Sequence, residues 1–231
     1  MIEFIKKKFL ENAALRHIYW RLKHLKEPEW AKKYFDDKSL NDGRNRIKLI
    51  QFINKKGQNK ILEVGCASGA NLFLLEQEKK YERLEGIDIS KYCVEEGNRI
   101  LNRHKSKVKL KFGNAKKLNY NDSSFDIVFI SGVAFDLSDE DLILAVKECL
   151  RITKKYFILH ISNYKLDTSL NIKSKAVFYK NHFLRDYNLF FKENFKQYPI
   201  EVIKLKTNIP EYETEIEFFN LNYLLVLKPI N

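Results

Sequence analysis

The chain has 231 residues, of which 45% are apolar and 31% are charged, and its formal net charge is +12. These values are typical of one globular domain, with or without an appendage. No apolar run approaches the roughly 18 residues that a membrane-spanning helix needs. In residues 1–20, charged side chains interrupt the apolar ones, which is not the pattern of a secretory signal.

The three cysteines, Cys66, Cys93 and Cys149, lie far apart, without a CxxC pair or a Cys/His cluster. This pattern argues against a disulfide scaffold and against a zinc or other metal site, and it favours a reducing compartment. We therefore predict a cytoplasmic protein without a metal. Cys93 and Cys149 stand in helical patterns among apolar residues, so we expect both in the core.

The basic excess is densest in residues 1–26, where seven Lys and Arg face two Glu, and lysines are spread along the rest of the chain. Such a balance favours anionic partners, among them RNA, phosphorylated substrates and membrane surfaces. A basic amphipathic helix over residues 1–26 would make peripheral contact with an anionic membrane. The alternative, which we favour, is that this helix packs on the protein.

Residues 1–53 predict a helical extension, because apolar residues recur there at helical spacing, as in Ile18, Leu22 and Leu25. Glu27-Pro28 and residues 41–43 interrupt the pattern. A last helix at residues 47–53 would lead into a sheet. We interpret the extension as a lid or as a helical layer on the remaining domain, residues 54–231. Its candidates for closing over a ligand are Trp30, Tyr34 and Arg44.

Strands and helices then alternate up to residue 163, which predicts a Rossmann-like α/β fold with a mostly parallel sheet and helices on both faces. The expected strands are 60–64, 84–88, 108–112, 125–130 and 155–161, and the expected helices are 70–79, 91–103 and 139–151. Residues 164–180 look irregular and 181–196 helical. Two final strands, 200–207 and 218–228, have a short connection and should pair antiparallel.

The most informative segment is residues 61–72, ILEVGCASGANL, an apolar strand that runs into a small-residue turn and a helix near Ala70. An open α/β sheet brings bare backbone to a ligand in this way, outside the carboxyl ends of its strands. Asp88 follows Gly65 by 23 residues, at the tip of the second strand, where a carboxylate accepts hydrogen bonds from ribose hydroxyls. The two features predict an adenosine-containing cofactor.

The turn favours S-adenosylmethionine over a dinucleotide. In a G-x-G-x-x-G turn the middle glycine lets the backbone approach the pyrophosphate. The aligned positions here are Gly65, Ala67 and Ala70, and the methyl group of Ala67 crowds a pyrophosphate. S-adenosylmethionine has no phosphate and presents an ammonium, a carboxylate and a ribose, which suit Glu63 and the turn amides.

From about residue 45 to residue 230 the chain resembles the class I S-adenosylmethionine-dependent methyltransferases. Five segments carry the resemblance in order: ILEVGCASG, EGIDIS, KFGNAKKL, FDIVFISGVAF and the strand 155–161 with its preceding helix. In that family a seven-stranded sheet ends in an antiparallel hairpin, which agrees with the C-terminal strands predicted above.

The resemblance implies a set of cofactor contacts. The backbone of Gly65, Cys66 and Gly69 would surround the methionine moiety, and Asp88 would bind the ribose. Ile89 would lie against the adenine, and Ser131 with Gly132 would form the floor of the pocket. Asn114 stands before Ala115 where the family usually has Asp, and its carbonyl can accept the bond from the adenine amino group without a charge. Asp88 as a helix N-cap and Asn114 as a turn residue are the structural alternatives.

Methyl transfer is an in-line displacement that commonly uses a general base. The polar residues expected near the pocket mouth are Asp136, His160, Asn163, Tyr164 and His182. His160, near the end of the fifth strand, and His182, at the start of the helix 181–196, are the candidate bases. A structural role is the alternative for each histidine.

The acceptor is predicted mainly by exclusion. Residues 131–135, SGVAF, lack the Asn/Asp-Pro-Pro-aromatic tetrapeptide of enzymes that methylate exocyclic amines of nucleobases, and no Cys-Pro context of the C5-cytosine enzymes occurs. Residues 129–164 resemble methyltransferases of nonulosonic-acid and other surface-glycan pathways, with Asp136 in place of a His. We therefore expect methylation of an O or N atom of a small, sugar-containing metabolite. An RNA methyltransferase and a non-catalytic S-adenosylmethionine-binding protein are the alternatives.

Overall fold

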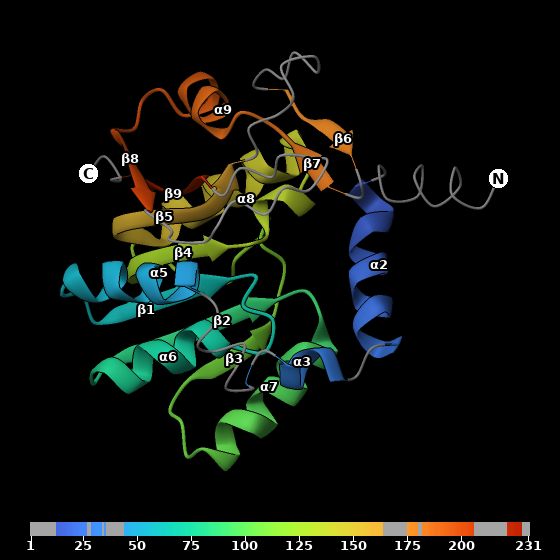
Figure 1. Ribbon diagram of the computed structural model, residues 1–231, viewed down its shortest axis with the longest axis vertical. Coiled ribbons are helices and arrows are strands. Elements are labelled where there is room, and N and C mark those ends of the chain that lie inside the picture. Colours follow the sequence, from blue (N-terminus) through green and yellow to red (C-terminus); the bar gives the residue numbers. More distant parts are fainter. Residues whose placement is uncertain are drawn as a thin grey trace.

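The structure is a computed structural model that describes residues 13–26, 29–33, 35, 44–163, 175–179, 182–205 and 221–227. Its centre is a seven-stranded sheet in the order β3-β2-β1-β4-β5-β9-β8 (Figure 1). These strands are β1 (Lys60–Val64), β2 (Arg83–Asp88), β3 (Lys109–Phe112), β4 (Phe125–Ser131), β5 (Thr153–Asn163), β8 (Ile200–Leu205) and β9 (Leu221–Leu227). A separate two-stranded sheet pairs β6 (Val177–Tyr179) with β7 (His182–Leu184).

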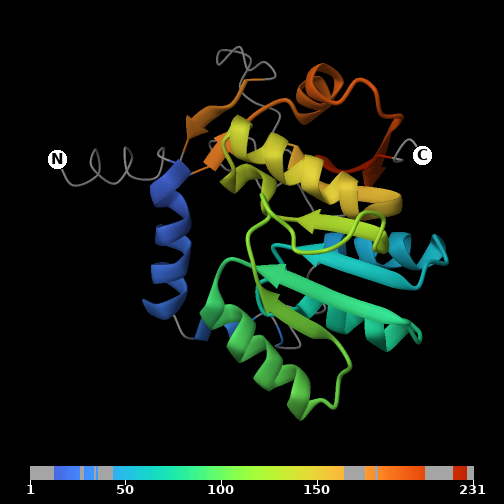
Figure 2. The same ribbon diagram turned by 180° about the vertical axis from the view of Figure 1, so that it is seen from behind.

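Helices cover both faces of the large sheet. They are α2 (Ala13–Lys26), α3 (Glu29–Lys33), α5 (Arg44–Lys55), α6 (Ala70–Glu78), α7 (Lys91–Arg103), α8 (Asp139–Ile152), α9 (Tyr187–Asn194) and the short 3-10 helix η1 (Ala134–Asp136). Helices α5 and α6 lie in front of the sheet in Figure 1, and α8 lies in front in the opposite view of Figure 2.

The alternation of side chains along each strand divides the core between these two helical layers. Leu62 and Val128 pack in one buried cluster with apolar residues of α8 and α9. Their neighbours Ile61 and Ile127 pack in a second cluster with residues of α5, α6 and α7. Because helices cover both faces of the central strands, the sequences of these strands are nearly continuous apolar runs.

The predicted fold class is confirmed. Strands β3, β2, β1, β4 and β5 are parallel to one another, and β9 lies antiparallel between β5 and the edge strand β8. The final hairpin therefore inserts its second strand beside β5, with its first strand at the sheet edge. The three helices expected between residues 70 and 151 agree with α6, α7 and α8 within one residue at each end.

The prediction of one helix over residues 181–196 is wrong in its first part. His182–Leu184 form β7, which pairs antiparallel with β6 in a stretch that the sequence suggested to be irregular. Helix α9 begins only at Tyr187, because the carboxylate of Asp186 accepts a hydrogen bond from the amide of Leu189 at 2.9 Å and caps the helix there. His182 is consequently a strand residue.

The N-terminal helices lie near the edge of the sheet where the parallel strands end. Figure 2 shows α2 standing at the edge toward which the arrowheads of β2 and β4 point. Helix α3 is fixed to the turn after β1 because the buried hydroxyl of Ser68 donates a hydrogen bond to the carbonyl of Ala31 at 2.9 Å. Of the helical extension predicted over residues 1–53, the first twelve residues lie outside the described residues. Within the described ranges, no helix has the length and apolar character needed to cross a membrane.

Glu85 on β2 is a buried carboxylate that stabilises the outer strands. It accepts hydrogen bonds from Arg83 Nε at 2.7 Å, from Tyr120 Oη at 2.6 Å and from Lys111 Nζ at 2.9 Å. Burial alone would raise its pKa, but these donors outweigh burial and lower the pKa from 4.5 to about 2.

We expect Glu85→Gln to lower the free energy of unfolding by roughly 2 kcal/mol at neutral pH, because the charge-assisted bonds are lost inside the protein. The folded-state pKa is depressed, so this stabilisation is complete above the ordinary pKa of 4.5 and disappears as the pH falls toward about 2. Urea unfolding at neutral and acidic pH measures both effects. Glu82→Gln, which removes an exposed partner of Lys60, is the control and should change stability by less than about 0.5 kcal/mol.

Candidate cofactor and acceptor site

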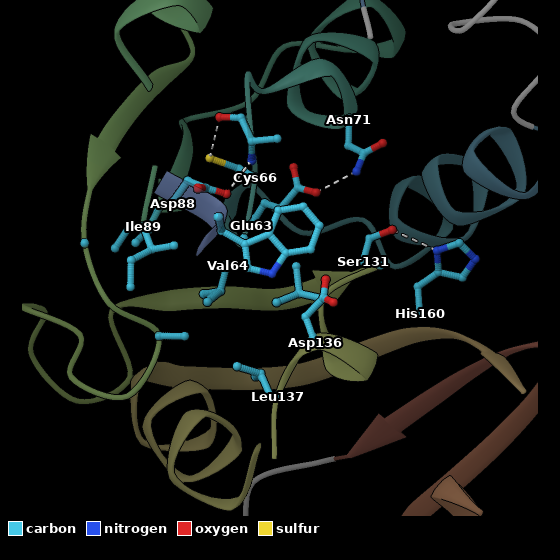
Figure 3. Close-up of a pocket in the computed structure, with 18 of the residues that line it drawn as sticks. Glu63, Val64, Cys66, Asn71, Asp88, Ile89, Ser131, Asp136, Leu137 and His160 are labelled. Carbon is cyan, nitrogen blue, oxygen red and sulfur yellow. Dashed lines mark hydrogen bonds between the residues drawn. The ribbon is translucent and has the colours of Figure 1, made fainter. Parts of the chain in front are cut away.

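A cavity of about 510 Å³ lies at the carboxyl ends of β1, β2, β4 and β5 (Figure 3). This volume falls within the range of roughly 300–1,000 Å³ that is usual for small-molecule sites. The predicted cofactor residues that line it are Glu63, Gly65, Cys66, Asp88, Ile89, Asn114, Ala115 and Ser131. Gly69 does not line the cavity but begins helix α6 in a left-handed conformation, with φ of +87°.

The turn after β1 uses its backbone amides within the protein. The amides of Gly65 and Cys66 both donate to the carbonyl of Ile87, at 2.7 and 3.1 Å, and the amide of Ala67 donates to Asp88 Oδ2 at 2.8 Å. A pyrophosphate needs free N–H donors at such a turn. With these donors occupied, the turn fits a cofactor without phosphate, and its neighbour α6 still presents the first turn of a helix to the cavity at Ala70.

Asp88 is held rigidly at the end of β2. Its Oδ2 accepts the Ala67 amide, and its Oδ1 accepts the Ser90 amide at 2.8 Å. Burial raises the pKa of this carboxyl, while hydrogen bonds from the amides of Ser90, Ala67 and Ile89 favour the charged form. A carboxylate has about four lone-pair directions, so it can still accept a ribose hydroxyl beside these amides. The N-cap of α7 is Ser90, whose hydroxyl accepts the amide of Cys93. Asp88 therefore does not serve as that cap.

Glu63 places a second carboxyl at the cavity. Its Oε1 accepts a hydrogen bond from Asn71 Nδ2 at 2.5 Å, whereas its Oε2 is buried and has no hydrogen-bond partner among the described residues. Burial raises the pKa of Glu63 to about 8, against the opposing effects of the Asn71 bond and of the Arg46 charge. An ammonium group in the cavity would both satisfy Oε2 and favour the ionised form. The ammonium of S-adenosylmethionine fits this site.

The adenine side of the site is more open. Ile89, Asn114 and Ala115 line the cavity, but Asn114 is exposed and its Oδ1 accepts the amide of Lys116 at 3.0 Å within a tight turn. The turn role that the sequence left as an alternative is thus present. The Asn114 amide nitrogen and the second lone pair of its oxygen are still available to a base edge.

Ser131 and His160 form a hydrogen-bonded pair across the ends of β4 and β5, with Oγ and Nδ1 2.9 Å apart (Figure 3). His160 Nε2 is buried and lacks a hydrogen-bond partner within the described part of the chain. Burial, assisted by the Arg46 charge, lowers the pKa of His160 to about 4, so its imidazole is neutral at physiological pH. It can orient a polar group there, but it is a weak proton acceptor.

His182 does not line the cavity, but it contacts a residue that does. Its Nδ1 lies 3.2 Å from Oδ1 of Asp136 on η1, and its ring meets the ring of Phe135 edge-on, with centroids 4.7 Å apart. Asp136, Phe135 and Leu137 line the cavity. The structure therefore brings together two residues that the sequence named separately, Asp136 and His182.

Sequence reasoning missed Trp20 on α2 and Arg46 on α5, which both line the cavity. Helical spacing indicated their elements but could not indicate which face of each helix meets the site. Of the predicted lid and mouth residues, Tyr34 and Tyr164 lie outside the described residues, and the side chains of Trp30, Arg44 and Asn163 are not described. Among the described residues, no group of three or more His, Cys, Asp or Glu is arranged to hold a metal ion.

Comparison with known proteins agrees with this geometry. Residues 61–156 match a family model described as a methyltransferase domain. The search of curated proteins finds no match to this sequence. Among solved structures, the chain is similar to magnesium protoporphyrin IX methyltransferase from Synechocystis PCC 6803 with bound S-adenosylhomocysteine. The identity is 13% and the TM-score is 0.67, with 92% of this chain and 99% of that chain covered.

A second similar structure is an S-adenosylmethionine-dependent methyltransferase from Aquifex aeolicus, at 14% identity and a TM-score of 0.60, with 88% of this chain and 98% of that chain covered. At these identities the likeness shows the fold. The chain therefore has a methyltransferase-domain match over residues 61–156 and the fold that these solved S-adenosylmethionine-dependent methyltransferases share.

Proposed function

We propose that the chain is an S-adenosylmethionine-dependent methyltransferase that acts on an O or N atom of a small molecule, with sugar-containing metabolites as the first candidates. The observation that supports this proposal is the composition of one cavity. Residues suited to the cofactor line the same space as Trp20, Phe135, Asp136 and Leu137, which leave an aromatic and partly acidic wall for an acceptor. A small molecule would fit such a wall, whereas an RNA chain needs an extended basic groove.

The residues present fit the cofactor. Asp88 would bind the ribose hydroxyls, Glu63 the ammonium, and Ile89 one face of the adenine. The first turn of α6, together with Arg46, would bind the carboxylate, because helix N-termini and guanidinium groups both attract anions. When bound, S-adenosylmethionine supplies an electrophilic methyl group. Its delivery depends on holding the acceptor atom in line with the breaking bond.

We also propose that residues 1–53 form a lid over this site and residues 54–231 the methyltransferase domain. Trp20 of α2 lines the cavity, and the Ser68 to Ala31 hydrogen bond links α3 to the turn after β1. Ligand binding at that turn is therefore coupled to the position of the N-terminal helices. The same placement favours packing of α2 on the protein over contact with a membrane.

Calorimetric titration with S-adenosylmethionine and S-adenosylhomocysteine, with NAD as the control ligand, tests the cofactor site. We expect Asp88→Ala to weaken binding of both sulfur compounds at least tenfold, or about 1.4 kcal/mol, because charge-assisted bonds to the ribose are lost. Asp126→Ala is the matched control. Asp126 also accepts two backbone amides, those of Asn59 and Lys60, but it lies outside the cavity.

Equal loss of affinity in the two variants would mean that Asp88 acts only through stability. Preferential NAD binding would contradict the proposed site.

Acceptor assays, run after the cofactor titration, would compare sugar nucleotides with RNA. The net charge of +12 favours RNA as the second candidate, and that candidate predicts binding that weakens steeply with added salt. Cofactor binding without turnover on any acceptor would favour a non-catalytic binding protein.

A further inference from the structure

We propose that His160 binds the cofactor: its Nε2–H group donates a hydrogen bond to the carboxylate of S-adenosylmethionine, and Ser131 is the positioning residue that orients the His160 ring for this contact. The inference rests on the proposed function and deepens it, because it makes the amino-acid end of the cofactor a determinant of specificity. Its basis is that Glu63 Oε2 and His160 Nε2 are buried in one cavity without a hydrogen-bond partner among the described residues.

The sheet places the three residues on one face. Ser131 at the end of β4 is the register partner of His160 on β5. It stands two positions beyond Phe129, the register partner of Glu63 on β1, so the side chains of Glu63, Ser131 and His160 point to the same side. Ser131 Oγ lies 2.9 Å from His160 Nδ1. When the Ser131 hydroxyl donates to Nδ1, the single proton of the neutral ring is on Nε2, which becomes a donor.

The two unpartnered atoms have opposite requirements. Glu63 Oε2 is a carboxylate oxygen and accepts hydrogen bonds, whereas the Nε2–H group of His160 donates one. Buried polar atoms without partners cost free energy and are uncommon in folded proteins. A ligand that satisfies both must bring a donor to Glu63 and an acceptor to His160. The ammonium and carboxylate of an amino acid do this within one group.

The spacing of the two residues fits such a group. Because β4 lies between β1 and β5, the backbones that carry Glu63 and His160 are about 10 Å apart across the sheet. An amino-acid ammonium and carboxylate, with a hydrogen bond of about 3 Å at each end, span about 9 Å. In Figure 3, Asp88 lies on one side of Glu63 and His160 lies on the other. The order Asp88, Glu63, His160 therefore matches the order ribose, ammonium, carboxylate along the cofactor.

The charges near His160 favour an anion there. Burial, with a smaller contribution from the Arg46 charge, lowers the pKa of His160 to about 4, so its ring is neutral at physiological pH. The Arg46 charge also opposes the rise in the pKa of Glu63, which places the guanidinium near both residues. A positive charge at this place attracts a carboxylate and repels an ammonium. The neutral N–H group of His160 would thus act beside Arg46 on the same carboxylate.

This contact excludes the role of general base that the sequence suggested for His160. A base needs the lone pair on Nε2, whereas the carboxylate needs the proton there. The contact instead holds the end of the cofactor. With the ribose at Asp88 and the amino-acid group at Glu63 and His160, the sulfur between them is fixed from both sides. The methyl group then keeps one direction, which an in-line transfer requires.

The test compares two ligands of the full chain by calorimetry. S-adenosylhomocysteine and 5′-methylthioadenosine share the adenosine and the sulfur, but only the first has the amino-acid group. We expect the unchanged protein to bind S-adenosylhomocysteine about 10²-fold more tightly or better. His160→Phe keeps a ring of similar size and removes Nε2. It should weaken binding of S-adenosylhomocysteine about tenfold and that of 5′-methylthioadenosine less than about twofold, because a charge-assisted bond to the carboxylate is lost.

Two further variants complete the comparison. His160→Gln places an amide donor near the position of Nε2 and should keep affinity for S-adenosylhomocysteine within about threefold of the unchanged protein. His104→Phe is the matched control. His104 is exposed and lies outside the cavity, so its replacement should change the affinity for neither ligand.

NMR of protein labelled with ¹⁵N-histidine gives a readout that a purely structural role of Ser131 would not move. The proton of the His160 ring should be on Nε2, and this N–H resonance should shift with S-adenosylhomocysteine but not with 5′-methylthioadenosine. Ser131→Ala removes the partner of Nδ1, so the proton should distribute over both nitrogens and affinity for S-adenosylhomocysteine should fall about fivefold. Ser131→Thr keeps the hydroxyl and should restore both properties.

The other outcomes overturn the proposal at identifiable steps. If His160→Phe leaves both affinities unchanged or weakens both ligands equally, Nε2 has no contact with the carboxylate. A ring that carries its proton on Nδ1 in the loaded protein would return His160 to the candidate bases. If the unchanged protein does not bind S-adenosylhomocysteine at all, the proposed function itself fails.

Discussion

Replacement of Gly65 by Ala is expected to abolish measurable cofactor binding and to lower the free energy of unfolding by about 3 kcal/mol. Two costs add at this position. The residue has φ of +80°, which an L side chain adopts at a cost of about 1–2 kcal/mol. A Cβ built there would lie 2.3 Å from Cγ2 of Val133, so the loop after β4 would have to move. Both segments line the cavity.

Gly132 provides a closely matched control. It also lines the cavity and has φ of +72°, but a Cβ at this position would meet no atom within 4 Å. Gly132→Ala should therefore incur only the conformational cost, about 1–2 kcal/mol, and should keep most of the cofactor affinity. Urea unfolding and titration with S-adenosylhomocysteine measure the two quantities on the same samples.

The difference between the two variants isolates the collision with Val133. Equal losses in both variants would mean that backbone conformation alone determines the effect and that the loop after β4 yields easily. A folded Gly65→Ala protein with unchanged affinity would contradict the assignment of this turn to the cofactor.

The cofactor half of the site could be predicted from the sequence because it is local. Glu63 and Gly65 stand on one strand and its turn, and Asp88 ends the next strand of a parallel sheet. The carboxyl ends of neighbouring parallel strands meet at one edge, so short motifs with regular spacing are enough to bring these residues together. Buried apolar runs indicated the strands themselves.

The acceptor half could not be predicted in the same way, because it depends on contacts between distant segments. Nothing in the local pattern around His182 indicates that it contacts Asp136. The helical pattern after residue 186 also made the three-residue strand β7 look like the start of a helix. Trp20 and Arg46 come from helices whose orientation on the sheet follows from tertiary packing. Short strands and helix faces of this kind are decided by packing more than by intrinsic preference.

Arg185 connects these distant segments, and its removal should have the second of the two largest effects. Its fully buried guanidinium donates hydrogen bonds to the carbonyls of Ala134 and Leu137, at 3.1 and 2.6 Å, and pairs with Asp139 at 2.9 Å. These contacts hold both ends of η1, which carries Asp136. Arg185→Met would leave the partly buried Asp139 carboxylate without its cationic partner and two carbonyls without their donor.

We expect Arg185→Met to lower the free energy of unfolding by about 3–5 kcal/mol, the usual result of breaking a buried ion pair. Arg151→Met is the control. Arg151 makes a similar set of bonds, to the carbonyls of Leu118 and Tyr120 and to carboxylates, but its side chain is 31% exposed. Water can replace those bonds, so its loss should cost only about 1 kcal/mol.

The two arginine variants also separate the halves of the site. Asp88 and Glu63 are held by β1, β2 and the turn between β1 and α6, none of which contacts Arg185 through a described hydrogen bond. Folded Arg185→Met protein should therefore keep its affinity for S-adenosylhomocysteine within a few-fold of the unchanged protein and lose methyl transfer to its acceptor. If instead cofactor binding weakens together with methyl transfer, η1 and the cofactor turn form one cooperative unit. Arg185 would then stabilise the whole cavity and would not act on the acceptor wall alone.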